Sequence, residues 1–180
     1  EYGHLARYAQ KITEKNGVVR YREGATERET IITSEGFRFT KENGVYILNA
    51  YNGTESTITL PKTINGAQYI VSNFSGGENI IIPNTVSVGY AAFYQNKTIE
   101  SVIFEKDVSE IGGYAFYSCI NLKKVVLPEG IEQLPGGLFE FCSELKEVTI
   151  PATVKEIQSS AFRYCESLEY IALPIELTTI

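Results

Sequence analysis

The amino-acid sequence is poor in several residue types on which common active sites depend. Its 180 residues include no methionine, a single histidine, His4, and a single aspartate, Asp107. One aspartate cannot supply an Asp-rich calcium loop, and His4 has no identifiable serine or cysteine partner for catalysis. Because the chain begins with Glu1 and lacks methionine, we expect it to begin downstream of the translated start, with any targeting segment outside it.

Positive charge and long apolar runs are also scarce. The formal net charge is -6, from 16 lysines and arginines against 22 aspartates and glutamates. This balance argues against nucleic-acid binding, because phosphate neutralisation needs a basic surface, and it disfavours acidic membrane surfaces for the same reason. The longest apolar run, Tyr90 to Tyr94, is five residues, far short of the roughly 18 residues of a membrane span. We expect neither a nucleic-acid partner nor a membrane span.

What the sequence does contain is a repeat of 23 residues, present in four regular copies from about Val86 to Leu173. Each copy is marked by a phenylalanine, by a cysteine or asparagine three positions later, and by an aliphatic residue three positions further on. The three columns are Phe93, Phe116, Phe139 and Phe162; Asn96, Cys119, Cys142 and Cys165; and Ile99, Leu122, Leu145 and Leu168. Such a period indicates a stacked supersecondary unit, because one unit cannot bury its apolar face alone. The sequence therefore predicts a β-rich solenoid.

One repeat is expected to contain a short strand, a second extended segment and a tight turn. Around Leu122 to Leu127 the inward residues alternate, and Pro128 ends the strand by removing a ladder donor. The pairs Val108/Ile111, Ile131/Leu134 and Val154/Ile157 indicate the second extended segment. The small pairs Gly112-Gly113, Gly136-Gly137 and Ser159-Ser160 predict the turn that delivers the phenylalanine to the core.

The sequence predicts three domains, two short ones before the repeats and the repeats themselves. Residues 1–35 contain a helical spacing over residues 3–15, an Asn16-Gly17 stop, and two β-prone runs, Val18–Arg22 and Thr30–Thr33, which form either a hairpin or two unrelated strands. Residues 36–57 carry the turn signal Asn43-Gly44 and predict a β-hairpin, which we interpret as the cap on the first repeat. Residues 58–180 form the solenoid.

The last repeat, from Leu173, is incomplete, with Pro174, Leu177 and Ile180 matching Pro128, Ile131 and Leu134. An unfinished repeat exposes strand groups and apolar side chains. We expect further native sequence to cover this edge, with oligomer formation through it as the alternative.

The repeats resemble the BspA-like leucine-rich repeats of bacterial surface and secreted proteins. The resemblance rests on Ile111-Gly112-Gly113-Tyr114-Ala115-Phe116-Tyr117-Ser118-Cys119, followed by Leu122 and Leu127-Pro128, and covers roughly residues 45–180. Departures are Asn96 in the cysteine column, Glu105 in the proline column, and Leu138 with Pro135; residues 1–35 match nothing in the pattern. The resemblance implies a right-handed leucine-rich-repeat-like stack with short parallel strands, an extracellular or cell-surface location, and binding of host or cell-surface proteins or glycans.

No chemical site emerges from the remaining residues. Stacking would place the three cysteines near 4.8 Å apart with parallel side chains, beyond the usual disulfide separation, and no histidine or acidic cluster accompanies them, so we interpret them as buried free thiols. The glycine pairs lack the Lys-Ser or Lys-Thr of a phosphate loop, and no spacing selects two carboxylates for acid-base work. We therefore expect no catalytic residue, no metal and no cofactor.

Two columns of side chains between the inward strand positions are expected to face outward. The first is unusually apolar, and its β-branched members Ile81, Ile103 and Val126 suggest a partner-binding surface, although strand propensity alone would also select them. The first column is Thr59, Ile81, Ile103, Val126, Thr149 and Ala172; the second is Thr57, Asn79, Ser101, Lys124, Glu147 and Tyr170.

Three classes of function remain open from the sequence. We favour a non-enzymatic interaction or adhesion module that binds through this outer face, with candidate residues Ile81, Ile103, Val126, Thr149, Lys124, Glu147 and Tyr170. The alternative is a structural spacer or stalk that displays another domain. The third is an enzyme with a site in the N-terminal segment, which would have to join His4 to distant carboxylates.

Overall fold

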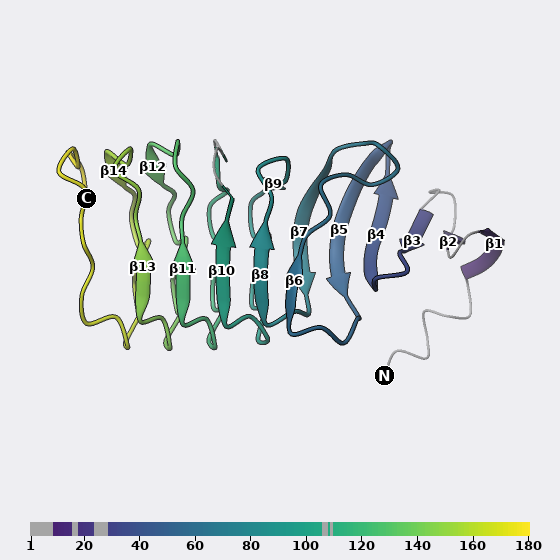
Figure 1. Ribbon diagram of the computed structural model, residues 1–180, viewed down its shortest axis with the longest axis horizontal. Helices are drawn as coiled ribbons and strands as arrows, with labels where there is room; N and C mark the ends of the chain where they lie inside the picture. Colours follow the sequence, from purple (N-terminus) through teal and green to yellow (C-terminus); the bar gives the residue numbers. More distant parts are fainter. Residues whose placement is uncertain (1–8, 16–17, 24–28, 106–107, 109) are drawn as a thin grey trace.

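The computed structural model describes residues 9–15, 18–23, 29–105, 108 and 110–180, with side chains from residue 29 onward. The repeats form successive turns of a solenoid whose main ladder has five parallel strands, in the spatial order β13-β11-β10-β8-β6 (Figure 1). The described part of the chain contains no α-helix. The strands are β6 (Thr57–Thr59), β8 (Asn79–Ile82), β10 (Ser101–Phe104), β11 (Lys124–Val126) and β13 (Glu147–Thr149).

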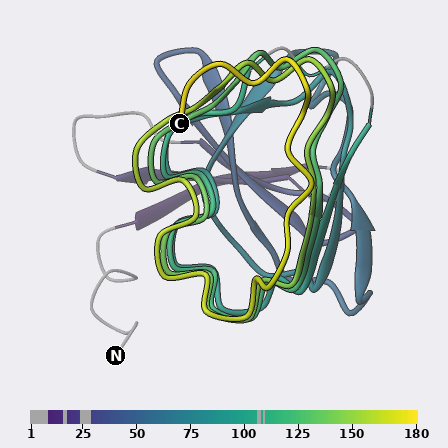
Figure 2. The same cartoon turned by 90° about the vertical axis from the view of Figure 1, so that its left-hand side faces the viewer.

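The second extended segment of the repeat is also present. Strands β12 (Gln133–Leu134) and β14 (Glu156–Ile157) pair in parallel, and a single parallel bridge joins Glu156 to Thr179. The corresponding strand β9 (Ser87–Val88) pairs with β7 (Tyr69–Ser75), and Val88 bridges to Ile111. Viewed along the stack, the units overlay, with the main ladder on one side of the core and the winding turn segments on the other (Figure 2).

The hairpin predicted in residues 36–57 is present. Strands β4 (Phe37–Glu42) and β5 (Val45–Tyr51) pair antiparallel, and Asn43 and Gly44 between them both adopt positive φ, as a tight hairpin turn requires. Strand β3 (Glu29–Ile32) extends this sheet beside β4, and β5 pairs in parallel with β7. The hairpin is therefore joined edge to edge with the array. Its role as a cap, and the domain boundaries at 35/36 and 57/58, stay predictions.

The predicted helix over residues 3–15 is wrong where the structure describes it. Residues Ala9–Lys15 form strand β1, which pairs antiparallel with β2 (Val18–Glu23), with Lys15 opposite Val18. Residues 3–8 and the expected stop at 16–17 lie outside the described residues. The β-branched residues Ile12, Thr13 and the Val18-Val19 pair favour extended structure, and Asn-Gly between two such runs is a two-residue hairpin signal. The helical spacing of apolar residues over 3–15 led to the wrong prediction, and the Asn-Gly turn signal was the better guide.

The core is a column of phenylalanine rings along the solenoid axis. The centroids of Phe93 and Phe116 lie 5.0 Å apart, and those of Phe116 and Phe139, and of Phe139 and Phe162, each 5.6 Å apart. Phe93, Phe116 and Phe139 are completely buried, as are the matching members of the cysteine and leucine columns, Cys119, Cys142, Ile99, Leu122 and Leu145. In the fourth unit Phe162, Cys165 and Leu168 are only half-buried.

The tight turn before each phenylalanine is built on one left-handed residue, and that residue is not always a glycine. Two positions before the phenylalanine the chain places Ala91, Tyr114, Gly137 and Ser160, all at φ between 55° and 63°. The predicted glycine pairs are therefore not equivalent: Gly112-Gly113 ends three positions before Phe116, whereas Gly136-Gly137 ends two positions before Phe139. Gly112 serves a different purpose: a Cβ there would lie 2.3 Å from the backbone of Gly89 and Tyr90. It allows close approach of two neighbouring units.

Candidate partner-binding surfaces

The first outward column forms a continuous line across the main ladder. Strand pairing places Thr59 beside Ile81, Ile81 beside Ile103, Ile103 beside Val126, and Val126 beside Thr149. Ile103 is 43% exposed, while Ile81 and Val126 are half-buried. The structure thus confirms the predicted alignment of this column from Thr59 to Thr149. Whether it binds a partner is a separate matter.

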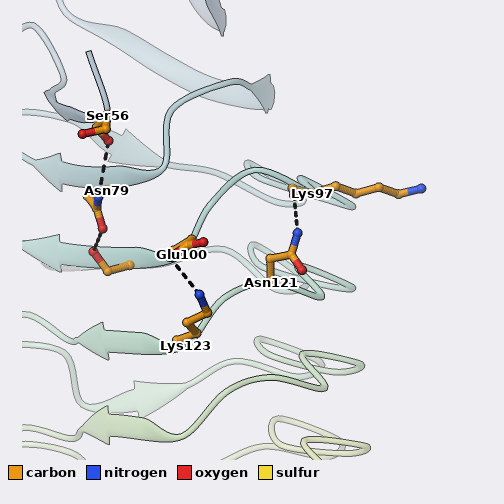
Figure 3. Close-up of polar contacts among 7 residues, drawn as sticks. Ser56, Asn79, Lys97, Glu100, Asn121 and Lys123 are labelled. Atoms are coloured by element: carbon orange, nitrogen blue, oxygen red, sulfur yellow. Dashed lines mark hydrogen bonds and ion pairs between the residues drawn. The ribbon is translucent and has the colours of Figure 1, made fainter. Parts of the chain in front are cut away.

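The second outward column is a line of polar contacts between neighbouring strands. The Ser101 hydroxyl donates to Asn79 Oδ1 at 2.7 Å, and the Asn79 amide donates to the Ser56 carbonyl at 3.4 Å (Figure 3). Further along, Lys124 Nζ lies 2.7 Å from a carboxylate oxygen of Glu147. The apolar column is therefore bordered on one side by polar groups that are already hydrogen-bonded or ion-paired.

Ala172 and Tyr170, the last predicted members of the two columns, lie beyond the last strand of the main ladder. Tyr170 is 78% exposed and lines an open hollow of about 760 Å³ together with Glu147, Thr149, Glu166 and Glu169. The structure brings Thr149, Glu147 and Tyr170 together at this end of the face, while Ile81 and Ile103 lie further along the ladder.

Ion pairs join equivalent positions of adjacent units around the solenoid. Lys123 pairs with Glu100 at 2.9 Å, Lys155 with Glu132 at 3.3 Å, and Arg163 with Glu140 at 3.4 Å. Each pair, like Lys124 with Glu147, spans 23 residues. Most of these side chains are half-exposed or more, so each pair contributes only about 0–1 kcal/mol to stability. Each pair links one unit to the next along the stack.

All three cysteines are free thiols; Cys119 and Cys142 are buried, as predicted, whereas Cys165 is only half-buried. The Cys119 thiol donates to the Phe93 carbonyl and the Cys142 thiol to the Phe116 carbonyl, both at 3.1 Å. Burial raises the pKa of Cys119 to about 12, and burial is also the main reason that the pKa of Cys142 is well above its usual value. A thiol kept protonated is a poor nucleophile and a poor metal ligand. Within the described residues no group of three or more His, Cys, Asp or Glu side chains is placed to hold a metal.

Asn96 takes the place of a cysteine and makes the same contact. Its Nδ2 donates to the Phe74 carbonyl at 2.9 Å, and its Oδ1 accepts from the backbone N–H of Thr98 and Ile99 at 2.9 and 3.2 Å. The side chain is 5% exposed. The Asn96 side chain is therefore committed to the interior.

Sequence reasoning missed a line of surface aromatic side chains on the turn segments, across the core from the main ladder. We call it the aromatic stripe: Tyr90, Tyr94, Tyr114, Tyr117, Phe141 and Tyr164. The rings of Tyr94 and Tyr117 stack at 4.8 Å and those of Phe141 and Tyr164 at 4.7 Å, while Tyr117 and Phe141 meet edge to face at 5.4 Å. Tyr114 contacts both Tyr90 and Tyr117. The contacts are unbroken across four units.

The stripe escaped notice because it changes register halfway. Four of its members follow the core phenylalanine, one position after it in two units, as Tyr94 and Tyr117, and two positions after it in the next two, as Phe141 and Tyr164. In the last two units the intervening position is occupied by Glu140 and Arg163, which pair with each other. Scanning the aromatic residues that flank each core phenylalanine, and not single columns, would have found it.

Three members of the stripe, Tyr114, Phe141 and Tyr164, occupy left-handed backbone positions that cost free energy. Phe141 and Tyr164 have φ of 64° and 59°, where the first two units place Gln95 and Ser118. A left-handed backbone costs an L-residue about 1–2 kcal/mol, and a bulky side chain there is unusual. The Arg163 guanidinium lies 4.7 Å over the Tyr164 ring and so covers part of it. The exposed aromatics are therefore placed where a small polar residue would serve the fold equally well.

The remaining expectations concern the N-terminal segment and membranes. His4, on which the enzymatic alternative depends, lies outside the described residues, so that alternative stays untested. In the part of the chain that the structure describes, no helix is long and apolar enough to cross a membrane.

Comparison with known proteins places the fold. The family model described as BspA type leucine rich repeat region matches residues 67–180 in six copies. A leucine-rich repeat protein from Bacteroides ovatus matches with a TM-score of 0.56 and 25% identity, over 80% of this chain and 35% of its own. One from Eubacterium ventriosum matches with a TM-score of 0.54 and 28% identity, over 77% of this chain and 46% of its own.

This chain therefore spans less than half the length of either structure. A leucine rich cell surface protein from Faecalibacterium prausnitzii is similar at a TM-score of 0.49 and 23% identity, over 87% of this chain and 51% of its own. No curated protein matches the chain at a significant level.

Proposed function

Because the chain belongs to the BspA-type leucine-rich repeat family, we propose that it is a non-enzymatic protein-interaction module of a bacterial cell-surface or secreted protein. It binds its partner through the outer face of the main ladder, around Ile103. Family membership supports an interaction module in general. Adhesion to a host or cell-surface protein or glycan, and the choice of face, are the proposal.

The observation that carries the choice of face is an apolar column on the open side of a parallel sheet. Parallel strands normally have both faces covered, and here Ile81, Ile103 and Val126 stand side by side on a face where Ile103 stays 43% exposed. A contiguous apolar surface with a polar border is typical of a binding site. Thr149 and the Lys124–Glu147 pair supply the border.

The surface is also well placed for recognition by a broad partner. Ile81, Ile103 and Val126 lie on strands that are hydrogen-bonded on both sides, so little conformational freedom is lost on binding. The hollow lined by Tyr170 and Glu147 continues the face beyond the last strand. An exposed tyrosine at the end of an apolar column is the kind of side chain that often dominates interface energies.

Two lysines in the middle of the column test the proposal. The double variant Ile103→Lys and Val126→Lys is expected to keep its fold, because both side chains point out of the sheet, and to lose attachment to immobilised host matrix or cells by about tenfold or more. The measurement is attachment of the purified protein, with circular dichroism as the check on folding.

The matched control is Thr63→Lys with Ala152→Lys, which adds the same charge at two exposed positions away from the column. Equal attachment by the folded test variant and the control would rule out this face. In that case the spacer or stalk, which displays another domain and needs no binding face, becomes the better description.

A further inference from the structure

The aromatic stripe is a second surface that the strand-face proposal does not use. It lies on the turn segments, on the other side of the core from the main ladder (Figure 2). Tyr90 is 70% exposed and Tyr164 48% exposed, with Tyr94 and Phe141 close to two-fifths. Tyrosine, phenylalanine and arginine are enriched at the centres of interfaces. The composition of the stripe therefore indicates a binding surface, and its geometry indicates the kind of ligand.

Its size excludes a broad contact. The exposed fractions of its four most accessible members together equal about two aromatic side chains, or roughly 300–500 Å². A stable dimer or a folded partner needs about 800 Å² on each side. The stripe is also narrow and runs along the solenoid for three inter-unit steps, on the order of 15 Å. A narrow line of this length suits one extended chain.

The ring geometry selects the chemistry of that chain. In the pairs Tyr94–Tyr117 and Phe141–Tyr164 the faces lie against each other, and Arg163 lies over the Tyr164 ring. What these rings offer is mainly their edges, which carry partial positive charge and attract carbonyl oxygens. Sugar rings, by contrast, pack on open aromatic faces. The edges therefore favour a polypeptide backbone over a glycan.

The phenol groups add hydrogen-bond donors to the stripe. In the described structure no protein group is hydrogen-bonded to the hydroxyls of Tyr94 or Tyr117. A tyrosine phenol is an O–H donor at neutral pH, and partial burial, with smaller contributions from nearby Tyr94 and Glu140, raises the pKa of the Tyr117 phenol further. The charged side chains within the stripe, Arg163 and Glu140, pair with each other. The stripe thus offers donors and apolar edges without a net charge.

We propose that the aromatic stripe binds an uncharged, proline-rich polypeptide segment in the polyproline II conformation. Such a segment has no internal hydrogen bonds, so its carbonyls are free to accept from the phenols, and its apolar rings pack on aromatic side chains. One polyproline turn rises about 9.3 Å, close to two inter-unit steps of about 4.8 Å. Successive turns therefore lie two units apart along the stripe, beside Tyr94 and Phe141 or beside Tyr117 and Tyr164.

The chain itself supplies variants that remove the stripe without disturbing the fold. Phe141→Ser and Tyr164→Gln install side chains that already occupy the same left-handed position in the first two units, as Ser118 and Gln95. The matched control is Tyr170→Ser, which removes a tyrosine that is 78% exposed on the opposite side of the core. All three variants are expected to melt at or near the temperature of the parent.

The test is a fluorescence anisotropy titration of a labelled nonaproline peptide, with a glycine-serine peptide of equal length as reference. The parent protein is expected to bind nonaproline and not the reference, the Phe141→Ser and Tyr164→Gln double variant to bind at least about tenfold more weakly, and Tyr170→Ser to bind like the parent. Nonaproline binding that is absent, or equal in the parent and the double variant, overturns the proposal.

Two other occupants are distinguished in the same experiment. Binding of cello-oligosaccharides that is lost in the double variant, without nonaproline binding, assigns the stripe to a glycan. A parent dimer in light scattering that becomes monomeric in the double variant assigns it to a second copy of this chain. Either result overturns the proposal. The Ile103→Lys and Val126→Lys variant should bind nonaproline normally, so this proposal and the strand-face proposal fail independently.

Discussion

Asn96 shows that the position three residues after each core phenylalanine requires a hydrogen-bond donor, which can be an amide as well as a thiol. Cys119, Cys142 and Asn96 all donate to the carbonyl of the phenylalanine in the preceding unit, at 2.9–3.1 Å. A buried carbonyl without a partner costs about 1–3 kcal/mol. Asn96 additionally satisfies two backbone N–H groups. The apparent exception in the column therefore performs the same structural function as the cysteines.

Phe139→Ala is expected to destabilise the protein more than Phe74→Ala. Both side chains are buried, but Phe139 stacks on Phe116 and on Phe162, whereas Phe74 has one ring neighbour in the column, Phe93. Loss of Phe139 should lower the free energy of unfolding by about 3–5 kcal/mol and uncouple the units on its two sides. Urea denaturation of the two variants measures the difference. Equal losses would count against a one-dimensional stack.

At the scale of the element, the turn segment is fixed by contacts between units as much as by its own residues. The backbone N–H groups of Phe93, Phe116 and Phe139 donate to carbonyls of the next unit at 2.7–3.0 Å. Each turn is thus held against its neighbour as strands are. This explains why Tyr114, Phe141 and Tyr164 can keep a left-handed backbone without glycine, since the surrounding hydrogen bonds determine the conformation.

Gly112→Ala is expected to disturb the approach of two turns. The added Cβ would lie 2.3 Å from the backbone of Gly89 and Tyr90, and the Gly112 N–H donates to Val88 at 2.9 Å, so the units would have to separate. We expect a loss of about 1–3 kcal/mol in the free energy of unfolding. Gly113→Ala is the matched control, because its Cβ would come no nearer than 3.4 Å to another atom. Similar losses from both changes would contradict close approach as the reason for Gly112.

At the scale of the whole molecule, one buried cluster runs from Ile31 in β3 to Ala161 in the fourth unit. The mixed sheet of β3, β4, β5, β7 and β9 and the main ladder both contribute to it. A stack of this kind has a stability that varies along its axis, because each unit depends on its immediate neighbours. The three thiols are reporters of that variation, placed 23 residues apart.

Thiol labelling should therefore follow position in the stack. At pH 8 we expect Cys165, which is half-buried, to react first, and Cys119 and Cys142 to react only when their units open. Burial raises the pKa of Cys165 to about 11, so its thiolate fraction, and with it the rate, should rise about tenfold per pH unit from pH 7 to 9. Mass spectrometry of labelled peptides measures each site. Faster labelling of Cys119 than of Cys165 would contradict the stack order.

The sequence by itself determined the repeat, because a period of 23 residues with an invariant phenylalanine has no other compact solution than a stack. It placed the inward columns, the outward columns as far as Glu147 and Thr149, and a hairpin within residues 36–57 correctly, since these follow from alternation and from turn residues that act locally. It failed at residues 9–15, where a short apolar spacing fits a helix and a strand about equally well until a partner strand is known.

Only the tertiary structure decided which exposed side chains come together. The aromatic stripe joins residues that differ in their position within the repeat: Tyr117 meets Phe141, which lies one position later in its own unit and has a left-handed backbone. The core columns keep one register because close packing of the interior leaves space for the ring at only one position of each unit. Surface side chains are under no such constraint, so their alignment depends on the stacked backbone and not on the period of the sequence.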